Sequence, residues 1–168
     1  MIHRLSYPLS SSDIMKGMNG KTKIISYSQV SNYKSINDLL YPYNNVVILY
    51  EWGNRIGHWT SLNKHPNGDL DFFDPYGYKP DDERSFIPDE HWESNFLSQL
   101  LANYQGKIYY NEYPLQTKNK NIATCGRWVL MRLILKDEPL DIFTRTFMKI
   151  NPLDREQLIT RITDKLIK

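Results

Sequence analysis

The stretch Asn119–Asp137, NKNIATCGRWVLMRLILKD, decides how this chain folds. It contains Cys125, the one cysteine of the sequence, followed by Gly126 and by a block from Arg127 to Lys136 with helical spacing. The block itself is apolar on nearly all sides of the expected helix, so we expect this helix to run through the core of the protein and not along the surface. Cys125 is then placed at the N-terminal end of a buried helix.

This position favours a reactive thiol at Cys125. The dipole and the unpaired N–H groups of a first helical turn stabilise a thiolate, which is the reactive form of cysteine. Most single cysteines are simply small, buried, apolar residues. A nucleophile requires a histidine elsewhere in the sequence, a residue to orient that histidine, and a donor for an oxyanion.

Length and composition indicate one globular domain, residues 1–168. The chain is 40% hydrophobic and 13% aromatic, which argues against disorder, and its net charge of +2 does not by itself indicate a nucleic-acid partner. One cysteine excludes an intrachain disulfide and a cysteine-rich zinc site, and the sequence has neither a membrane-spanning apolar run nor a signal peptide. We expect a soluble, intracellular monomer without a metal, a small-molecule cofactor or a membrane partner.

The hydrophobic pattern predicts an α+β fold, with a small, mostly antiparallel sheet packed against a central helix and flanking helices. Asn45–Trp52 is the clearest strand, because its continuous apolar run is typical of a strand buried on both faces. Asn67-Gly68 predicts a tight hairpin turn between the next two strands. Other strands are expected at 23–28, 58–64, 70–74 and 107–115, helices at 10–18, 35–41, 89–104, 127–136, 140–150 and 154–167, and loops at 53–57, 81–88 and 116–124.

His58 is the candidate base. It begins a strand directly after a glycine-containing loop, a place from which a side chain can reach a neighbouring element. Asp74 ends the partner strand across the hairpin, and antiparallel pairing brings the start of one strand beside the end of the other. We expect Asp74 to bind the imidazole and fix its tautomer, with Asp71, nearer the turn, as the rival carboxylate. The remaining histidines are expected to be solvated surface groups: His3, His65 and His91.

Gln116 is the candidate oxyanion donor. It ends the expected strand just before the Cys125 loop. An uncharged amide can donate to a developing oxyanion without competing for the proton, and the backbone N–H of Cys125 would be a second donor.

These residues stand in a recognisable order: Gly57-His58-Trp59, Phe73-Asp74-Pro75-Tyr76-Gly77, Gln116 and Cys125-Gly126. The set resembles the adenain and Ulp1-like cysteine protease clan, most closely the adenovirus-type maturation proteases, a branch that includes proteases of virophages and Polinton-like viruses. The similarity runs from about residue 45 to residue 136, over half of the chain. Papain-like enzymes place the cysteine first and the histidine late, so they do not fit this order.

The resemblance implies roles for these residues. Cys125 would be the nucleophile, His58 the general base, Asp74 the residue that orients it, and Gln116 the oxyanion-hole side chain. Trp59 would help wall a narrow slot for small substrate residues, with Trp52 as a second substrate contact.

The activity implied is that of a cysteine endopeptidase that cleaves viral capsid precursors during virion maturation, in the virus factory of the host cytoplasm or in the virion. A protease of ubiquitin-like modifiers, an acetyltransferase on the same fold and a non-catalytic binding module are the alternatives.

The sequence departs from the family pattern in two places. Family members usually place the glutamine six residues before the cysteine, whereas Gln116 stands nine before Cys125, so Asn119 is a competing amide. Thr124 also stands where the family often has an acidic residue. The adenovirus enzymes use DNA as a cofactor, and DNA is a possible activating polyanion here because basic residues lie near Cys125 and at the C-terminus: Lys118, Lys120, Arg127, Arg155, Arg161, Lys165 and Lys168.

Overall fold

The computed structural model describes residues 2–52, 56–82, 86–87, 89–91 and 94–168. The side chains of His3 and Trp52 lie outside this description, as do loop residues 53–55, residues 83–85 and 88 of the expected 81–88 loop, and residues 92–93 of the expected 89–104 helix. The described helices are α1 (Ile2–Leu5), α2 (Ser11–Gly17), α3 (Ile36–Leu40), α4 (Phe96–Ala102), α5 (Cys125–Ile134), α6 (Leu140–Met148) and α7 (Pro152–Leu166), with 3-10 turns η1 (Tyr27–Asn32) and η3 (Asp89–His91). The strands are β1 (Lys23–Ser26), β2 (Asn45–Trp52), β3 (Ile56–Lys64), β4 (Leu70–Phe73) and β5 (Ile108–Tyr110).

The strands form one mixed sheet in the order β1-β2-β3-β4-β5. The α+β class is confirmed, but the expectation of a mostly antiparallel sheet is wrong. Pairs β2–β3 and β3–β4 are antiparallel, whereas β1–β2 and β4–β5 are parallel. The physical reason lies in the connections: η1 and α3 follow β1, and η3 and α4 follow β4, and these long crossovers carry the chain back to the end from which it started.

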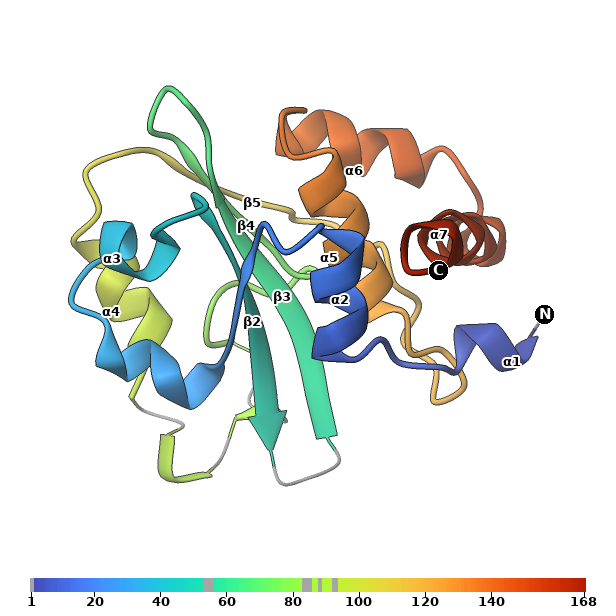
Figure 1. Ribbon diagram of the computed structural model, residues 1–168, viewed down its shortest axis with the longest axis horizontal. Helices are drawn as coiled ribbons and strands as arrows, with labels where there is room; N and C mark the ends of the chain where they lie inside the picture. Colours follow the sequence, from blue (N-terminus) through green and yellow to red (C-terminus); the bar gives the residue numbers. More distant parts are fainter. Residues whose placement is uncertain (1, 53–55, 83–85, 88, 92–93) are drawn as a thin grey trace.

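Helices cover both faces of the sheet, so the protein has two apolar cores. Figure 1 shows the strands running between α3 and α4 on one side and α2, α5, α6 and α7 on the other. Alternate residues of β2 enter the two cores: Val46 and Ile48 face the α3–α4 side, and Val47 faces the α5 side. The continuous apolar run of this strand therefore has the two-sided burial that the sequence predicted.

The central helix α5 is buried along nearly all of its length. Every residue from Cys125 to Leu133 is buried. The two arginines in this span are paired, Arg127 with Asp164 at 2.8 Å and Arg132 with Asp71 at 3.0 Å. The helix begins two residues earlier than the expected 127–136 block and places Cys125 in its first turn.

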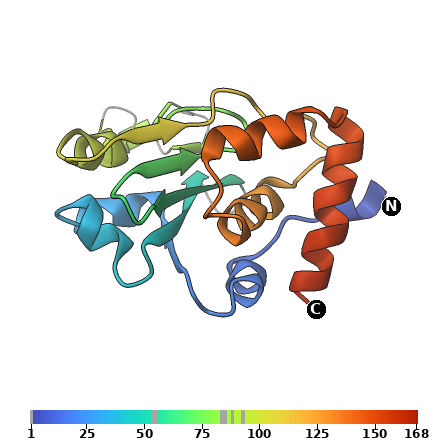
Figure 2. The same cartoon turned by 90° about the horizontal axis from the view of Figure 1, so that it is seen from above.

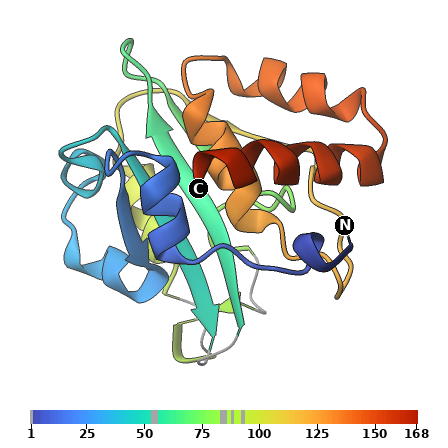
Figure 3. The same ribbon diagram turned by 45° about the vertical axis from the view of Figure 1, so that its right-hand side comes forward.

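The two ends of the chain meet beside this helix. The helix α7 lies across α5 (Figure 3), and α1 lies next to α7 (Figure 2), where Arg4 binds Asp164 at 3.0 Å.

Three elements differ from expectation. The helix expected at 89–104 is a 3-10 turn at 89–91 and a helix from Phe96, since Asn95 adopts a left-handed φ of 47°. The strand expected at 107–115 stops at Tyr110, because the side chain of Asn111 takes over the main-chain hydrogen bonds of Asp74. β3 begins at Ile56, so Gly57 belongs to the strand and not to the preceding loop.

Candidate active site

His58 and Asp74 form a short, buried hydrogen bond. The Nε2 atom of His58 lies 2.6 Å from Oδ1 of Asp74, and the two side chains are 1% and 4% exposed. The same Oδ1 atom accepts the backbone N–H of Tyr76 at 2.7 Å. The expected meeting of His58 and Asp74 across the hairpin is therefore confirmed, and Asp74 is held by its own turn as well.

Sheet register explains why these residues meet. The last β3–β4 pair is Ser61 with Phe73, and the chain turns away at Asp74 while β3 continues back to Ile56. His58 therefore lies beyond the end of β4, on the face that alternation gives to Leu62 of the α3–α4 core. It meets the N-terminus of α5 past that end of β4.

The surroundings of His58 raise its pKa. Burial by itself lowers the pKa of an imidazole, but the charge and hydrogen bond of Asp74 outweigh burial, and Cys125 adds to the rise by hydrogen bond and charge. Together they raise the pKa of His58 from 6.5 to about 10. The folded protein therefore holds this side chain as an imidazolium at neutral pH.

Two aromatic rings enclose the imidazole. The Tyr76 ring stacks on it with a distance of 4.6 Å between ring centroids and an interplanar angle of 7°. The Phe86 ring stacks on it with a centroid distance of 5.1 Å and an interplanar angle of 23°. The ammonium of Lys118 lies over the rings of both Tyr76 and Tyr78 and donates to the Tyr78 hydroxyl. Aromatic faces attract a cation, so the Tyr76 and Phe86 rings favour the protonated form of the His58 imidazole and fix its plane.

Cys125 belongs to the surroundings of His58 that raise the pKa of the imidazole. The thiol is 8% exposed, in the first turn of α5. Asp74 occupies Nε2, and within the described part of the chain Nδ1 has no hydrogen-bond partner of regular geometry. Cys125 is among the groups that raise the His58 pKa, and Nδ1 is the ring nitrogen that Asp74 leaves open.

Gly126 makes this approach of the helix possible. A Cβ atom at Gly126 would lie 3.0 Å from Cβ of Leu9 and 3.0 Å from Cδ1 of Trp59. A side chain at this position would have to push Leu9 or Trp59 aside, so glycine suits the close packing of the first turn of α5 against β3.

Gln116 lies in the site, and Asn119 does not. The Gln116 side chain is buried, and its Nε2 atom donates at 3.4 Å to the hydroxyl of Tyr76 and at 3.4 Å to the carbonyl of Ile122. Asn119 is exposed, and its side chain accepts the backbone N–H of Asn121 within its own turn. Of the two competing amides, Gln116 is the one that is buried and bound to Tyr76, which stacks on His58.

The indole of Trp59 packs against the start of α5. It is 7% exposed and donates to the carbonyl of Leu9 at 3.0 Å. It also lines a cavity of about 580 Å³ together with Met15 of α2 and Ile24 of β1. For Trp52, the second expected substrate contact, the description covers only the backbone at the end of β2.

Asp71, the rival carboxylate, is occupied elsewhere. It binds His65 at 2.5 Å and Arg132 at 3.0 Å, on the α5 face of the sheet. The expectation that His65 is a solvated surface group is therefore wrong. The hydrogen bond that the His65 ring N–H donates to Asp71 outweighs partial burial and raises the His65 pKa.

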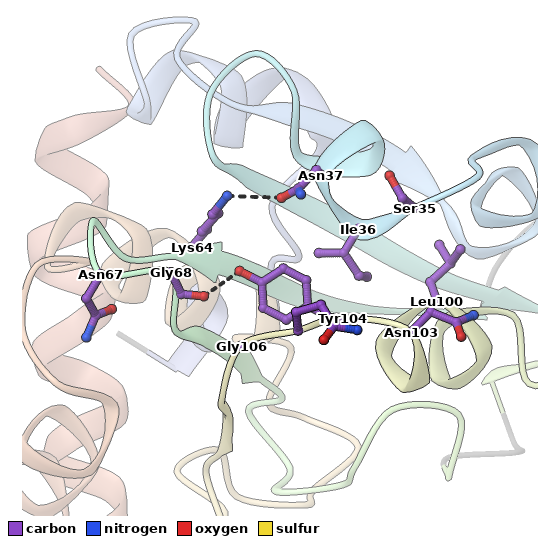
Figure 4. A pocket seen from close by; sticks show the side chains of 11 residues that line it. Ser35, Ile36, Asn37, Lys64, Asn67, Gly68, Leu100, Asn103, Tyr104 and Gly106 are labelled. Atoms are coloured by element: carbon purple, nitrogen blue, oxygen red, sulfur yellow. Dashed lines mark hydrogen bonds between the residues drawn. The ribbon is translucent and has the colours of Figure 1, made fainter.

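A separate cavity of about 370 Å³ lies at the other end of β3, between the hairpin, α3 and α4 (Figure 4). Lys64 donates to Asn37 there at 3.0 Å, and the Tyr104 hydroxyl donates to the carbonyl of Gly68. Lys64 is six residues along the strand from His58, about 20 Å away. Among the described residues, those that line this cavity include no cysteine, histidine or carboxylate.

Several residues of the site escaped prediction. Thr124 has no acidic side chain, but its hydroxyl donates to Glu156 of α7 at 2.6 Å, so a carboxylate reaches this place from another helix. Asn111 binds both main-chain groups of Asp74, its N–H at 3.0 Å and its carbonyl at 2.6 Å. Glu156 and Asn111 belong to no sequence motif, and only folding brings them to the site.

Comparison with known proteins places the chain in a viral family. It is 36% identical over 166 residues to the uncharacterized protein V9 of Sputnik virophage. The alignment covers 92% of this chain and 93% of the virophage protein. The chain belongs to the V9 family. No protein-family model matches it. The central domain of the uncharacterized Lpg1148 protein from Legionella pneumophila covers 95% of this chain and 98% of its own, with 18% identity and a TM-score of 0.44, too low to support an argument about fold or function.

The described residues of this V9-family chain contain no helix long and apolar enough to cross a membrane. They also contain no group of three histidine, cysteine, aspartate or glutamate side chains arranged to hold a metal ion.

The raised pKa of His58 predicts how stability depends on pH. Because the pKa rises from 6.5 to about 10 on folding, protonation stabilises the fold, fully below pH 6.5 and progressively less as pH rises through about 10. Over that range stability should fall by up to about 1.4 kcal/mol per pH unit. Asp74→Asn removes the largest cause of the raised pKa and should flatten this slope. Urea unfolding of both proteins across the range measures it, and equal slopes would contradict the assignment.

Proposed function

We propose that this protein is a cysteine endopeptidase that cleaves viral precursor proteins during virion maturation. One observation carries the proposal: a buried imidazole is bound through Nε2 to Asp74 at 2.6 Å, and Cys125, in the first turn of a buried helix, is among the groups that raise its pKa. A nucleophile, a base and an orienting carboxylate in this order are the parts of a catalytic triad.

The chemistry begins with the pair of Cys125 and His58. In the resting pair the thiol proton has already passed to His58, and the thiolate attacks the scissile carbonyl carbon. The carbonyl oxygen becomes an oxyanion as the C–S bond forms. His58 then protonates the departing amine, the C–N bond breaks and a thioester remains. His58 then takes a proton from water, the hydroxide attacks the thioester carbon, and the C–S bond breaks. The product leaves with a free carboxyl group, and the thiolate and the protonated His58 are restored.

Asp74 and the aromatic stack support the charged state of His58. The carboxylate holds the imidazolium that forms when the thiol proton is transferred, and the Tyr76 and Phe86 rings keep it in one plane. A fixed imidazolium beside Cys125 would stabilise the thiolate that attacks the substrate.

Gln116 and the backbone N–H of Cys125 form the proposed oxyanion hole. The amide of Gln116 is buried but held only by two hydrogen bonds of 3.4 Å, so it can turn toward a stronger acceptor. Preorganised donors of this kind stabilise the charge that develops in the transition state.

A viral precursor is the proposed substrate class because the family includes a virophage protein. Activation by DNA receives little support, since Arg127 and Arg155 are buried and bound within the fold. A ubiquitin-like modifier is the alternative substrate, and parallel digestion of virion protein precursors and of such a modifier precursor distinguishes the two.

Cys125→Ala tests the proposed activity. It removes the sulfur and leaves a small side chain at a helix start, so cleavage of viral precursors should be abolished while the thermal unfolding temperature stays close to that of the parent. Gel analysis of precursor digestion measures the activity. Processing by the variant at the parental rate would overturn the proposal.

Gln116→Ala tests the oxyanion donor, with Asn119→Ala as the matched control. Loss of one such donor lowers kcat by roughly 100- to 1,000-fold. We expect this loss for Gln116→Ala and a near-parental kcat for the exposed Asn119→Ala. Steady-state kinetics on one peptide substrate measures both, and the opposite result would transfer the role to Asn119.

A further inference from the structure

Glu156 is a fully buried carboxylate close to the proposed site. It stands in α7 and is 0% exposed. It accepts three hydrogen bonds: from the backbone N–H of Thr117 at 2.8 Å, from the hydroxyl of Thr124 at 2.6 Å and from the indole of Trp128 at 3.0 Å. One carboxylate thus binds three groups from the loop before α5 and from α5 itself.

These donors stand next to the two halves of the proposed oxyanion hole. Thr117 directly follows Gln116, and Thr124 directly precedes Cys125. The Gln116 amide and the Cys125 backbone N–H therefore each adjoin a residue that Glu156 holds. Both ends of the loop from Thr117 to Thr124 therefore donate to the same carboxylate, that of Glu156.

The main chain leading into Gln116 is held from both sides. Pro75, next to Asp74, accepts the N–H groups of Leu115 at 2.9 Å and of Gln116 at 3.0 Å. Arg155 donates to the carbonyl of Leu115 at 2.9 Å. The Gln116 side chain has only its two 3.4 Å hydrogen bonds, so its position depends mainly on this main chain.

We infer that Glu156 is a positioning residue that sets the spacing between Gln116 and the Cys125 N–H. This role rests on the proposed protease function. Glu156 acts through Thr117 and Thr124 and does not touch the reacting atoms. A shift of about 1 Å at a catalytic group can cost about 100-fold in rate, so this control of spacing bears directly on turnover.

The arrangement requires an acceptor on both oxygens. Burial outweighs the hydrogen bonds from Thr124, Thr117 and Trp128 and the charge of Arg155, so the pKa of Glu156 is raised above its ordinary value. A glutamine has the same shape but carries an NH₂ group on one side. In one orientation that group meets the N–H of Thr117, and in the other it meets the indole N–H of Trp128, so each leaves two donors facing one another.

Glu156→Gln is the decisive variant, and the exposed Glu112→Gln is its control for lost charge. Two rates are compared on each protein: peptide cleavage, which needs the oxyanion hole, and alkylation of Cys125 by iodoacetamide, which needs only the thiolate. We expect kcat of Glu156→Gln to fall roughly 10- to 100-fold with KM nearly unchanged, while alkylation changes by less than about threefold. Glu112→Gln should match the parent in both.

Thr124→Val supplies a second test, because it keeps the side-chain shape and removes one of the three hydrogen bonds. In Thr124→Val, kcat for peptide cleavage should fall, by less than in Glu156→Gln, while the rate of Cys125 alkylation stays near the parental value. If Glu156→Gln does not fold, Thr124→Val alone tests the positioning role. A parental kcat, or an equal fall of cleavage and alkylation, would overturn the positioning role. Cleavage by Cys125→Ala at the parental rate would instead overturn the proposed protease function, on which this role rests.

Discussion

The buried hydrogen bond between His58 and Asp74 is the interaction on which the rest of the site depends. Burying an unpaired imidazolium is costly, and a carboxylate at 2.6 Å offsets that cost. The pair in turn constrains the fold: Asp74 must leave the ladder after Phe73, and Asn111 must satisfy its main chain where β5 ends. Sheet termination and the charged state of His58 are therefore two consequences of one contact.

The site also depends on a meeting of the two cores. His58 projects on the face covered by α3 and α4, whereas α5 packs on the other face. They come together only past the end of β4, and Gly126 permits the close approach of α5 to Trp59. From the outer side, α7 fixes the loop before Cys125 through Glu156. Each group of the proposed triad thus comes from a different part of the chain.

Much of this could be predicted because some signals are local. The apolar run of β2, the Asn67-Gly68 turn and the apolar α5 block each act within a few residues, and the turn alone sets which residues of β3 and β4 face each other. The approach of His58 to Asp74 follows from that register. The apolar block of α5 is also a local signal, and it predicts Cys125 at the start of a helix.

Other features depend on distant contacts and left no local signal. The parallel pairing of β1 with β2 and of β4 with β5 depends on crossovers whose direction a sequence pattern does not encode. The left-handed Asn95 divides an apolar stretch that reads as one helix. Glu156 lies among charged residues typical of a solvated helix face, and only the packing of α7 on α5 turns it inward.

The most direct test of the central claim is the rate at which iodoacetamide alkylates Cys125 in mildly acidic solution, in the parent and in His58→Gln. The glutamine keeps a donor for Asp74 but cannot become a cation. If His58 and Cys125 form an ion pair, the parent should react at least about 10-fold faster than the variant, since the imidazolium stabilises the thiolate. Equal rates in the two proteins would contradict the account.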